Sequence, residues 1–143
     1  MFLGEYRHNL DEKNRLAVPS KFRQDLKGGL IVTKGLDNCL FVYPKKQWNE
    51  WAEKLSKLPI SQAKSRAFLR MMLGGAMEMT LDKQGRIVIP DYLVEYGKLS
   101  KQIVLAGLYD RIELWNAEEW KKYKSKTEKD SNDIAETLAE MGV

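Results

Sequence analysis

The chain has 143 residues, a net charge of +4 and 43% apolar residues, a composition typical of one ordinary globular domain or two very small ones. No segment approaches the roughly 20 apolar residues of a membrane span, and residues 1–15 lack the apolar run of a secretory signal. One cysteine, Cys39, and one histidine, His8, exclude an intrachain disulfide framework and a zinc site with several such ligands. We therefore expect a cytoplasmic protein with a single buried thiol.

The charge is distributed unevenly along the chain. Residues 127–143 contain five carboxylates and one lysine, so this acidic tail has a net charge of −4 and residues 1–126 carry +8. A basic body favours a polyanionic partner such as nucleic acid, although many domains of similar charge bind none. Charge alone therefore leaves the function open.

An internal repeat is the most informative feature of the sequence. Residues 10–19, LDEKNRLAVP, align with residues 81–90, LDKQGRIVIP. Further matches follow in the same order after a shift of one residue: 31–36 with 103–108, 40–43 with 112–115, and Trp48 with Trp120. Chance similarity does not keep Asp, Arg, Pro, Gly and Trp in step over this length. We infer a duplication.

Both copies predict the same elements in chain order. A short apolar strand leads into a polar loop, and a second strand, 16–18 or 87–89, follows and ends at a proline, which cannot donate to a β-ladder. That proline, Pro19 or Pro90, is expected at the first position of a short helix. A hairpin and a tryptophan-bearing helix complete each copy. In the first copy the predicted elements are helix 20–23, strands 30–33 and 40–43, and the helix with Trp48 and Trp51. In the second copy they are helix 91–94, strands 102–105 and 111–115, and the helix with Trp120.

Two helical segments lie outside the repeated elements. Residues 61–73 predict a helix between the copies, with Ser61 as its N-cap. The acidic tail predicts a weakly amphipathic helix with apolar residues at i, i+4 and i+7, which docks on a neighbour or stays free: Ile134, Leu138 and Met141. The chain divides into a first repeat (5–48), a helical connector (49–75), a second repeat (76–120) and a C-terminal helix and tail (121–143).

The repeats are too small to fold as independent beads. A unit of about 45 residues with three or four short strands has open edges and little core. Two such units cover each other if they exchange strands. We therefore predict a mainly β fold with peripheral helices (α+β), built from two intertwined repeats related by a pseudo-two-fold axis.

The two polar loops contain the residues that shape the candidate site. Their fourth position is Asn14 or Gly85, and these residue types adopt positive φ most readily, so each loop predicts a tight turn. Asp11 and Asp82 can accept turn amide hydrogens or pair with the arginine that ends each loop. Both aspartates are therefore expected to act mainly in the loop structure.

Four loop cations are the candidate DNA-binding residues. Arg15 and Arg86 end the two loops, and Lys13 and Lys83 lie within them. An arginine held by a neighbouring carboxylate loses less side-chain entropy when it contacts a phosphate or a guanine edge. A purely structural Asp–Arg pair would be duplicated as well, so the repeat alone does not separate binding from folding.

The sequence resembles the MraZ family of bacterial regulators, within the AbrB-like swapped-hairpin superfamily. The resemblance covers nearly the whole chain and rests on these residues: the opening 1–6, both Asp-x-x-x-Arg loops with the prolines that follow, 35–37 and 40–43. Asn14 departs from the glycine usual in the family, and asparagine can hold the same turn.

The resemblance implies a double-split β-barrel of the swapped-hairpin type and a homo-oligomeric ring of eight or more subunits. It also implies a nucleoid-associated regulator, expected to be a repressor, that binds short direct repeats upstream of the division and cell-wall gene cluster, its own promoter included. In that family the Asp-x-x-x-Arg loops are regarded as the DNA contacts. They correspond here to Arg15 and Arg86, with Lys13 and Lys83 in support.

Other function classes remain as alternatives. One is a ring-forming scaffold in which the Asp–Arg pairs serve only folding, and another is an antitoxin-like DNA-binding protein whose acidic tail neutralises a toxin. The tryptophans follow helical spacing and favour core packing over base stacking. No nucleophile or metal constellation is recognisable, so we expect no enzymatic activity, cofactor, metal ion, small-molecule substrate or membrane partner.

Overall fold

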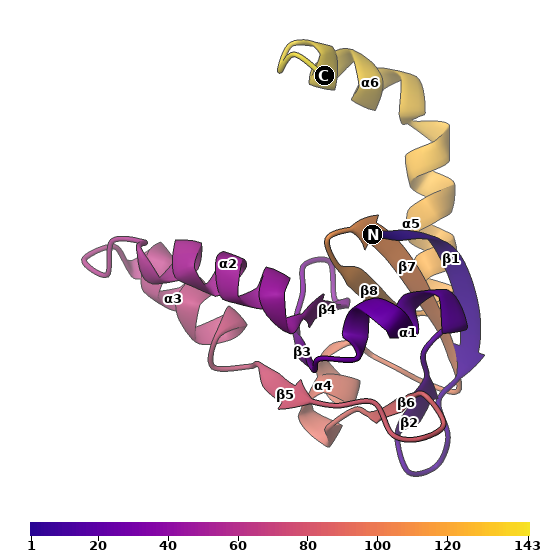
Figure 1. The fold of residues 1–143 in the computed structure, drawn as a ribbon. Helices are drawn as coiled ribbons and strands as arrows, with labels where there is room; N and C mark the ends of the chain where they lie inside the picture. Colours follow the sequence, from indigo (N-terminus) through magenta and orange to yellow (C-terminus); the bar gives the residue numbers. More distant parts are fainter.

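A computed structural model describes all residues, 1–143, as an α+β fold of eight strands and six helices (Figure 1). The strands are β1 (Phe2–Asn9), β2 (Arg15–Ala17), β3 (Leu30–Lys34), β4 (Leu40–Pro44), β5 (Met77–Met79), β6 (Arg86–Val88), β7 (Gln102–Tyr109) and β8 (Ile112–Asn116). The helices are α1 (Ser20–Leu26), α2 (Lys45–Ser56), α3 (Ala63–Met72), α4 (Asp91–Tyr96), α5 (Ala117–Lys129) and α6 (Ser131–Ala139). The order of elements in the two repeats agrees with the duplication.

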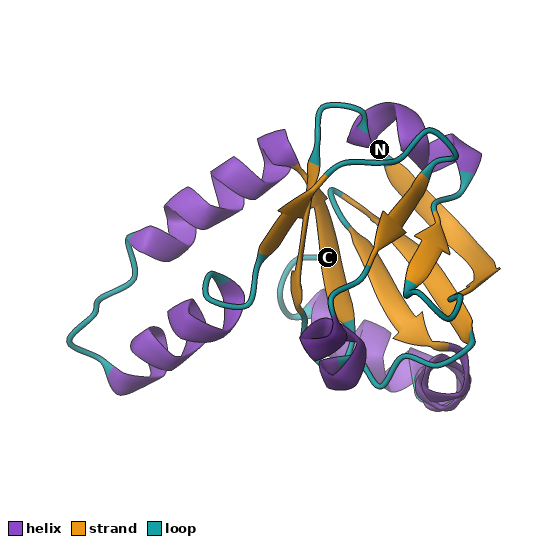
Figure 2. Cartoon of the chain, turned by 90° about the horizontal axis from the view of Figure 1, so that it is seen from below, coloured by secondary structure: helices purple, strands orange, loops and turns teal.

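The strands form one large and one small antiparallel sheet (Figure 2). The large sheet has six strands in the order β1-β7-β8-β4-β3-β5, and the small sheet pairs β2 with β6. The first strand of each repeat pairs with a strand of the other repeat, β1 with β7 and β5 with β3. The predicted strand exchange is confirmed. The hydrogen-bonded strands do not close into a barrel, because β1 and β5 remain the two edges of the large sheet.

The main core holds the β2–β6 ribbon against the large sheet. It contains 18 buried residues, contributed by both sheets, by α1 and α4 and by the loops next to them. Leu16 of β2 is fully buried and Ile87 of β6 is 2% exposed. Because side chains alternate between the faces of a strand, the residues before and after them point away from the core. This alternation directs Arg15 and Arg86 to the outer face of the ribbon.

A second core lies between the large sheet and helices α2, α3 and α5. It contains eight buried residues, among them Cys39, which is 1% exposed, as expected for a buried thiol. Trp48, Trp51 and Trp120 pack against this core while partly exposed, which confirms the prediction of core packing. The helical arm α2–α3 extends from the body of the protein on one side (Figure 1).

Some element boundaries differ from the sequence prediction. Pro19 and Pro90 are the N-caps of α1 and α4, one position earlier than expected, because their ψ angles of 139° and 148° keep the extended conformation of the preceding strand. Helix α3 starts after Gln62, since the amide of Gln62 donates to the carbonyl of Pro59 (3.1 Å) and Ser61 lies inside that turn. Strand β7 continues to Tyr109 because β1 pairs with it along its whole length.

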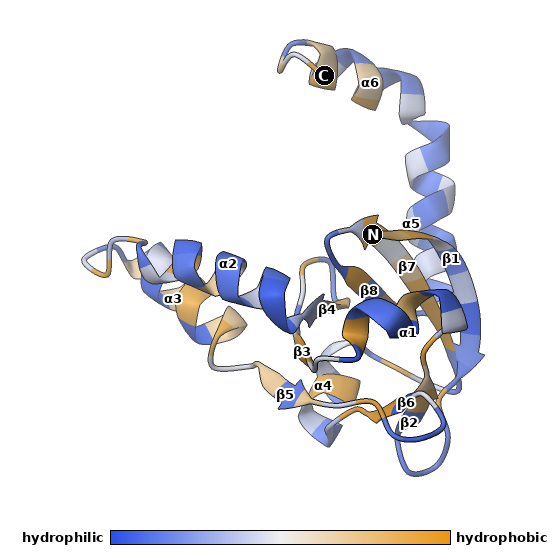
Figure 3. Ribbon diagram, viewed as in Figure 1, coloured by the Kyte–Doolittle hydropathy of each residue, from blue (hydrophilic) through white to orange (hydrophobic).

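The C-terminal segment forms two helices that leave the body of the protein (Figure 1). Helix α5 is mainly hydrophilic, whereas α6 has apolar positions along it (Figure 3). The three apolar residues of this segment belong to neither core and are exposed: Ile134 by 41%, Leu138 by 38% and Met141 by 74%. None of the helices is both long enough and apolar enough to cross a bilayer.

Candidate nucleic-acid interface

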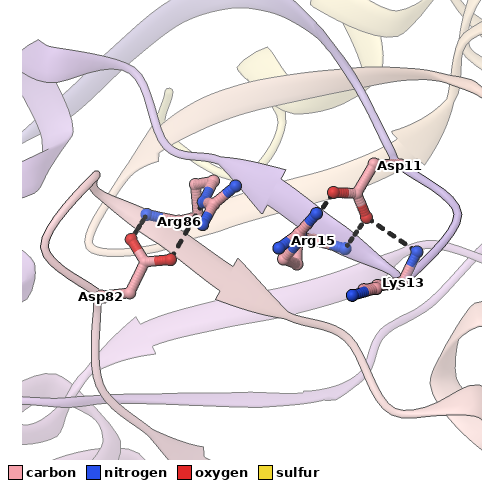
Figure 4. A network of polar contacts seen from close by, with 5 residues as sticks. All are labelled: Asp11, Lys13, Arg15, Asp82 and Arg86. Carbon is pink, nitrogen blue, oxygen red and sulfur yellow. Dashed lines mark hydrogen bonds and ion pairs between the residues drawn. The ribbon is translucent and has the colours of Figure 1, made fainter.

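The loop before β2 is a tight turn organised by one carboxylate (Figure 4). Asp11 Oδ1 accepts the backbone amides of Lys13 (2.9 Å) and Arg15 (2.8 Å). Asp11 Oδ2 accepts the side-chain Nε of Arg15 at 2.6 Å. Asn14 has a φ of 59°, the left-handed conformation that asparagine tolerates better than most residues. The aspartate thus fixes both the turn and the direction of the arginine.

The loop before β6 repeats this arrangement atom for atom (Figure 4). Asp82 Oδ1 accepts the amides of Gln84 (2.8 Å) and Arg86 (2.9 Å), and Oδ2 accepts the Nε of Arg86 (2.9 Å). Gly85 takes the left-handed position with a φ of 73°. The duplication therefore extends from the sequence to the geometry of both arginines.

Both aspartates are held in their charged form. The hydrogen bond from the backbone amide of Arg15 is the largest cause that lowers the pKa of Asp11. Desolvation opposes it, and the guanidinium of Arg15 and the amide of Lys13 lower the pKa further. Arg86 lowers the pKa of Asp82 through the same two contacts. Each loop therefore keeps an ionised carboxylate beside its arginine at neutral pH.

The two arginines share the outer face of the β2–β6 ribbon. Arg15 lies opposite Val88, and Arg86 lies opposite Ala17, so the arginines are diagonal neighbours on one face of the ribbon, close enough for long side chains to meet. Figure 4 shows both arginines between the two aspartates. Their side chains are 35% and 29% exposed, and their terminal nitrogens make no hydrogen bond within the chain. Two anchored guanidiniums thus present free donors on one face.

The two lysines lie farther out than the arginines. Lys13 and Lys83 are exposed and make no ion pair. Because β2 and β6 are antiparallel, the loops that precede them are at opposite ends of the ribbon. The structure therefore spreads the four predicted cations along the ribbon and does not gather them in one cluster.

Comparisons with known proteins place the chain in a family. The sequence model described as "MraZ protein, putative antitoxin-like" matches residues 1–71 and again residues 72–141. The chain belongs to the MraZ family. The transcriptional regulator MraZ of Clostridium acetobutylicum is 48% identical over 143 residues, which is the whole of both chains. That of Desulforamulus reducens is 48% identical over 141 residues, or 99% of each chain, and that of Clostridium tetani is 47% identical over both full lengths.

The structure adds three residues that the repeat did not single out in this MraZ-family chain. Arg23 of α1 donates from Nε to the carbonyl of Val18 (2.8 Å) and lies against Gly85. Asp91 accepts the side-chain amide of Asn14 at 2.7 Å. Val88 is 55% exposed on the outer face of the ribbon. Comparison of the repeats misses Arg23 and Asp91 because each has a different residue type at the equivalent position. In the sequence, Arg23 could have been found as a cation about one helical turn after Pro19.

Proposed function

We propose that this transcriptional regulator binds double-stranded DNA through the outer face of the β2–β6 ribbon. The observation that carries the proposal is the pair of carboxylate-anchored arginines, Arg15 and Arg86, with free terminal nitrogens on that face. The major groove of B-DNA admits a two-stranded β-ribbon, and a guanidinium pairs with guanine O6 and N7 through two hydrogen bonds. The exposed Val88 suits contact with a thymine methyl group.

The lysines of the loops have the complementary role. Lys13 and Lys83 are exposed near opposite ends of the ribbon, where DNA strands on either side of a groove would pass. Contacts to phosphates position a protein on DNA, whereas contacts to base edges specify the sequence. We assign register chiefly to the lysines and sequence preference chiefly to the arginines.

We further propose that the chain acts as a homo-oligomeric ring of eight or more subunits on short direct repeats. One ribbon with a few cations binds weakly, and its affinity falls steeply with salt. Several ribbons on correctly spaced repeats gain about 10²–10⁴-fold through effective concentration. The open edges β1 and β5 and the exposed apolar side chains of α6 support assembly, since such surfaces are usually covered by another chain.

Family membership supports the biological assignment. We propose a cytoplasmic, nucleoid-associated repressor of the division and cell-wall gene cluster that also acts on its own promoter. The exchange of β1 and β5 between the repeats supports assignment of the fold to the double-split barrel of the swapped-hairpin type. The repeat units are then 5–48 and 76–120, with 49–75 as connector and 121–143 as tail.

Filter binding of Arg15→Ala to an operator duplex and to a random duplex across a salt series tests the proposal. We expect the variant to lose most of its preference for the operator while light scattering shows an unchanged oligomer. If the variant oligomer binds the operator normally, the ribbon is not the interface. If the wild type ignores every duplex at low salt, the scaffold alternative replaces DNA binding.

The ring proposal has its own test. Duplexes that keep the repeats and alter the interval between them are compared with duplexes altered outside the repeats. A multivalent assembly loses much more affinity from the change of interval. Equal affinities, or a stable monomer in light scattering, would contradict the ring.

A further inference from the structure

The two loops have different neighbours although their own geometry is the same. In the first loop, the side chain of Asn14 donates to Asp91 Oδ1 at 2.7 Å, so a carboxylate of the second repeat stands beside it. In the second loop, the equivalent Gly85 is covered by Arg23, a cation of the first repeat. The contacts between repeats therefore place opposite charges at the fourth position of the two loops.

Arg23 fits its position closely. A Cβ atom on Gly85 would lie 2.4 Å from Arg23 Nε and 2.5 Å from its Cζ, so a side chain at position 85 would displace the guanidinium. The carbonyl oxygen of Val18 accepts a hydrogen bond from Arg23 Nε at 2.8 Å, and the amide of Val18 donates to the carbonyl oxygen of Gly85 at 2.9 Å. The absent side chain at position 85 thus leaves the space that Arg23 occupies.

Arg23 is presented in the same way as the two loop arginines. In each case Nε is occupied, by Asp11 Oδ2 for Arg15, by Asp82 Oδ2 for Arg86 and by a backbone carbonyl for Arg23. The terminal nitrogens of Arg23 have no hydrogen-bond or ion-pair partner in the chain. A guanidinium fixed at Nε with two free NH₂ groups is prepared for an anionic oxygen pair such as a phosphate.

The charges of the two ribbon ends differ accordingly. Within the second loop, residues 82–86, Lys83 and Arg86 stand against Asp82, and Arg23 adds a further positive charge beside Gly85. At the first loop, they are Lys13 and Arg15 against Asp11, Glu12 and Asp91. Lys101 also lines the hollow beside the first loop and brings that end to neutrality. The second end keeps an excess of two positive charges.

We propose that the two loops are not equivalent on DNA, and that Arg23 completes a phosphate-binding end of the ribbon at residues 82–86. This inference rests on the proposed DNA binding and adds an asymmetry to it. The 82–86 end supplies most of the contact with the DNA backbone. The 11–15 end, where Asp91 offsets the cations, contributes mainly through Arg15 at the base edges.

The first test compares Arg23→Ala with Lys21→Ala, which removes the same charge from an exposed position of α1 two residues away, on another face of the helix. Binding to a 40-base-pair duplex of mixed sequence is measured over a salt series. We expect Arg23→Ala to lose about tenfold in affinity and to reduce the slope of log K against log salt by about 0.9, the value of one phosphate contact. Lys21→Ala should change neither quantity appreciably. Equal behaviour of the two variants would overturn the role of Arg23.

A second set of variants does not depend on the folding of Arg23→Ala. Asp91→Ser introduces at position 91 the serine that the first repeat has at the equivalent position 20. The variant should bind the same duplex about two- to fivefold more tightly, because it lacks a carboxylate near the phosphates. Arg86→Ala should weaken this non-specific binding more than Arg15→Ala. Unchanged binding by Asp91→Ser, or equal losses in the two arginine variants, would make the loops equivalent.

DNA binding and the asymmetry of the two loops are distinguished by different results. If the wild type binds neither the mixed-sequence duplex nor one selected from a random pool, DNA binding itself is wrong. If the wild type binds and Arg15→Ala loses the selected duplex while Arg23→Ala behaves like Lys21→Ala, only the asymmetry is wrong. Thermal unfolding of each variant establishes that the compared proteins are folded.

Discussion

Thr33 in β3 donates its hydroxyl to the carbonyl oxygen of Met72, the last residue of α3, at 2.6 Å. Both residues are fully buried, and the hydroxyl supplies a buried side-chain partner for this carbonyl near the helix end. Since α3 is the second helix of the arm, this hydrogen bond adds to the apolar contacts of the second core that join the arm to the large sheet. It connects the helical connector to the candidate interface.

Thr33→Val should destabilise the protein by about 1–3 kcal/mol, because valine has nearly the same shape but leaves a buried carbonyl without this donor. Thermal or denaturant unfolding measures the change. Thr127→Val is the matched control: the hydroxyl of Thr127 donates to Tyr123 O at 3.0 Å on the exposed helix α5, and water replaces it there. An equal effect of the two substitutions would contradict the role given to burial.

Gly107→Ala should prevent β1 from pairing normally with β7. A Cβ at position 107 would lie 2.5 Å from the backbone nitrogen of Leu3 and 2.6 Å from the carbonyl carbon of Phe2, so backbone must move. We expect a loss of at least about 2 kcal/mol in the free energy of unfolding. Gly28→Ala, where a Cβ meets nothing within 4 Å, should leave stability nearly unchanged. A mild effect at position 107 would mean that β1 is easily displaced.

Asp11→Asn should separate specific from non-specific binding of DNA. The variant loses one negative charge, so its net charge rises by one and its binding to a random duplex at low salt should be equal or stronger. An amide oxygen accepts from Arg15 less strongly than a carboxylate, so the guanidinium is less well oriented and operator binding should fall about tenfold. The ratio of the two affinities is the measurement. A ratio equal to that of the wild type would show that Asp11 does not orient Arg15 for recognition.

The pH dependence of stability should report the two loop carboxylates. Their pKa values are lowered in the folded state, first by the amides and then by the guanidiniums of Arg15 and Arg86. Their stabilising contribution is therefore fully present above the unfolded pKa, about 3.9, and is lost as the pH falls through the lower folded values. We expect the stability difference between the wild type and Asp11→Asn/Asp82→Asn to be constant from pH 6 to 8 and to shrink below about pH 4. A difference that changes near neutral pH would require another titrating group.

Local sequence signals predicted the elements and their order because those signals are short-range. The turn at Asp11 and Asn14, the strand with Leu16 and the helix after Pro19 follow from residue types within one turn or one strand. The duplication supplied the second copy and the argument for exchange. Burial of the tryptophans followed from their helical spacing.

Features that depend on contacts between distant segments were not visible in the sequence. The length of β7 is set by its pairing with β1, about a hundred residues earlier. The cover of Gly85 by Arg23 and the contact of Asn14 with Asp91 occur only once the repeats interlock. The hydrogen bond from Thr33 to Met72 joins β3 to α3 across 39 residues of sequence. Periodicity describes one segment at a time, so it contains no information on which side chain of the other repeat arrives at a given turn.

The exchange of β1 and β5 makes the halves of this protein mutually dependent during folding. A nascent chain that has emerged only as far as α3 has β1 without its partner β7, and β3 without β5 on its edge. The unpaired edges of β1 and β3 are then exposed, so we expect such an intermediate to be prone to aggregation until the C-terminal half is synthesised. Conversely, the exposed turn between α2 and α3 is the place where we expect the polypeptide to tolerate a cut, with the two co-expressed fragments assembling into one native unit.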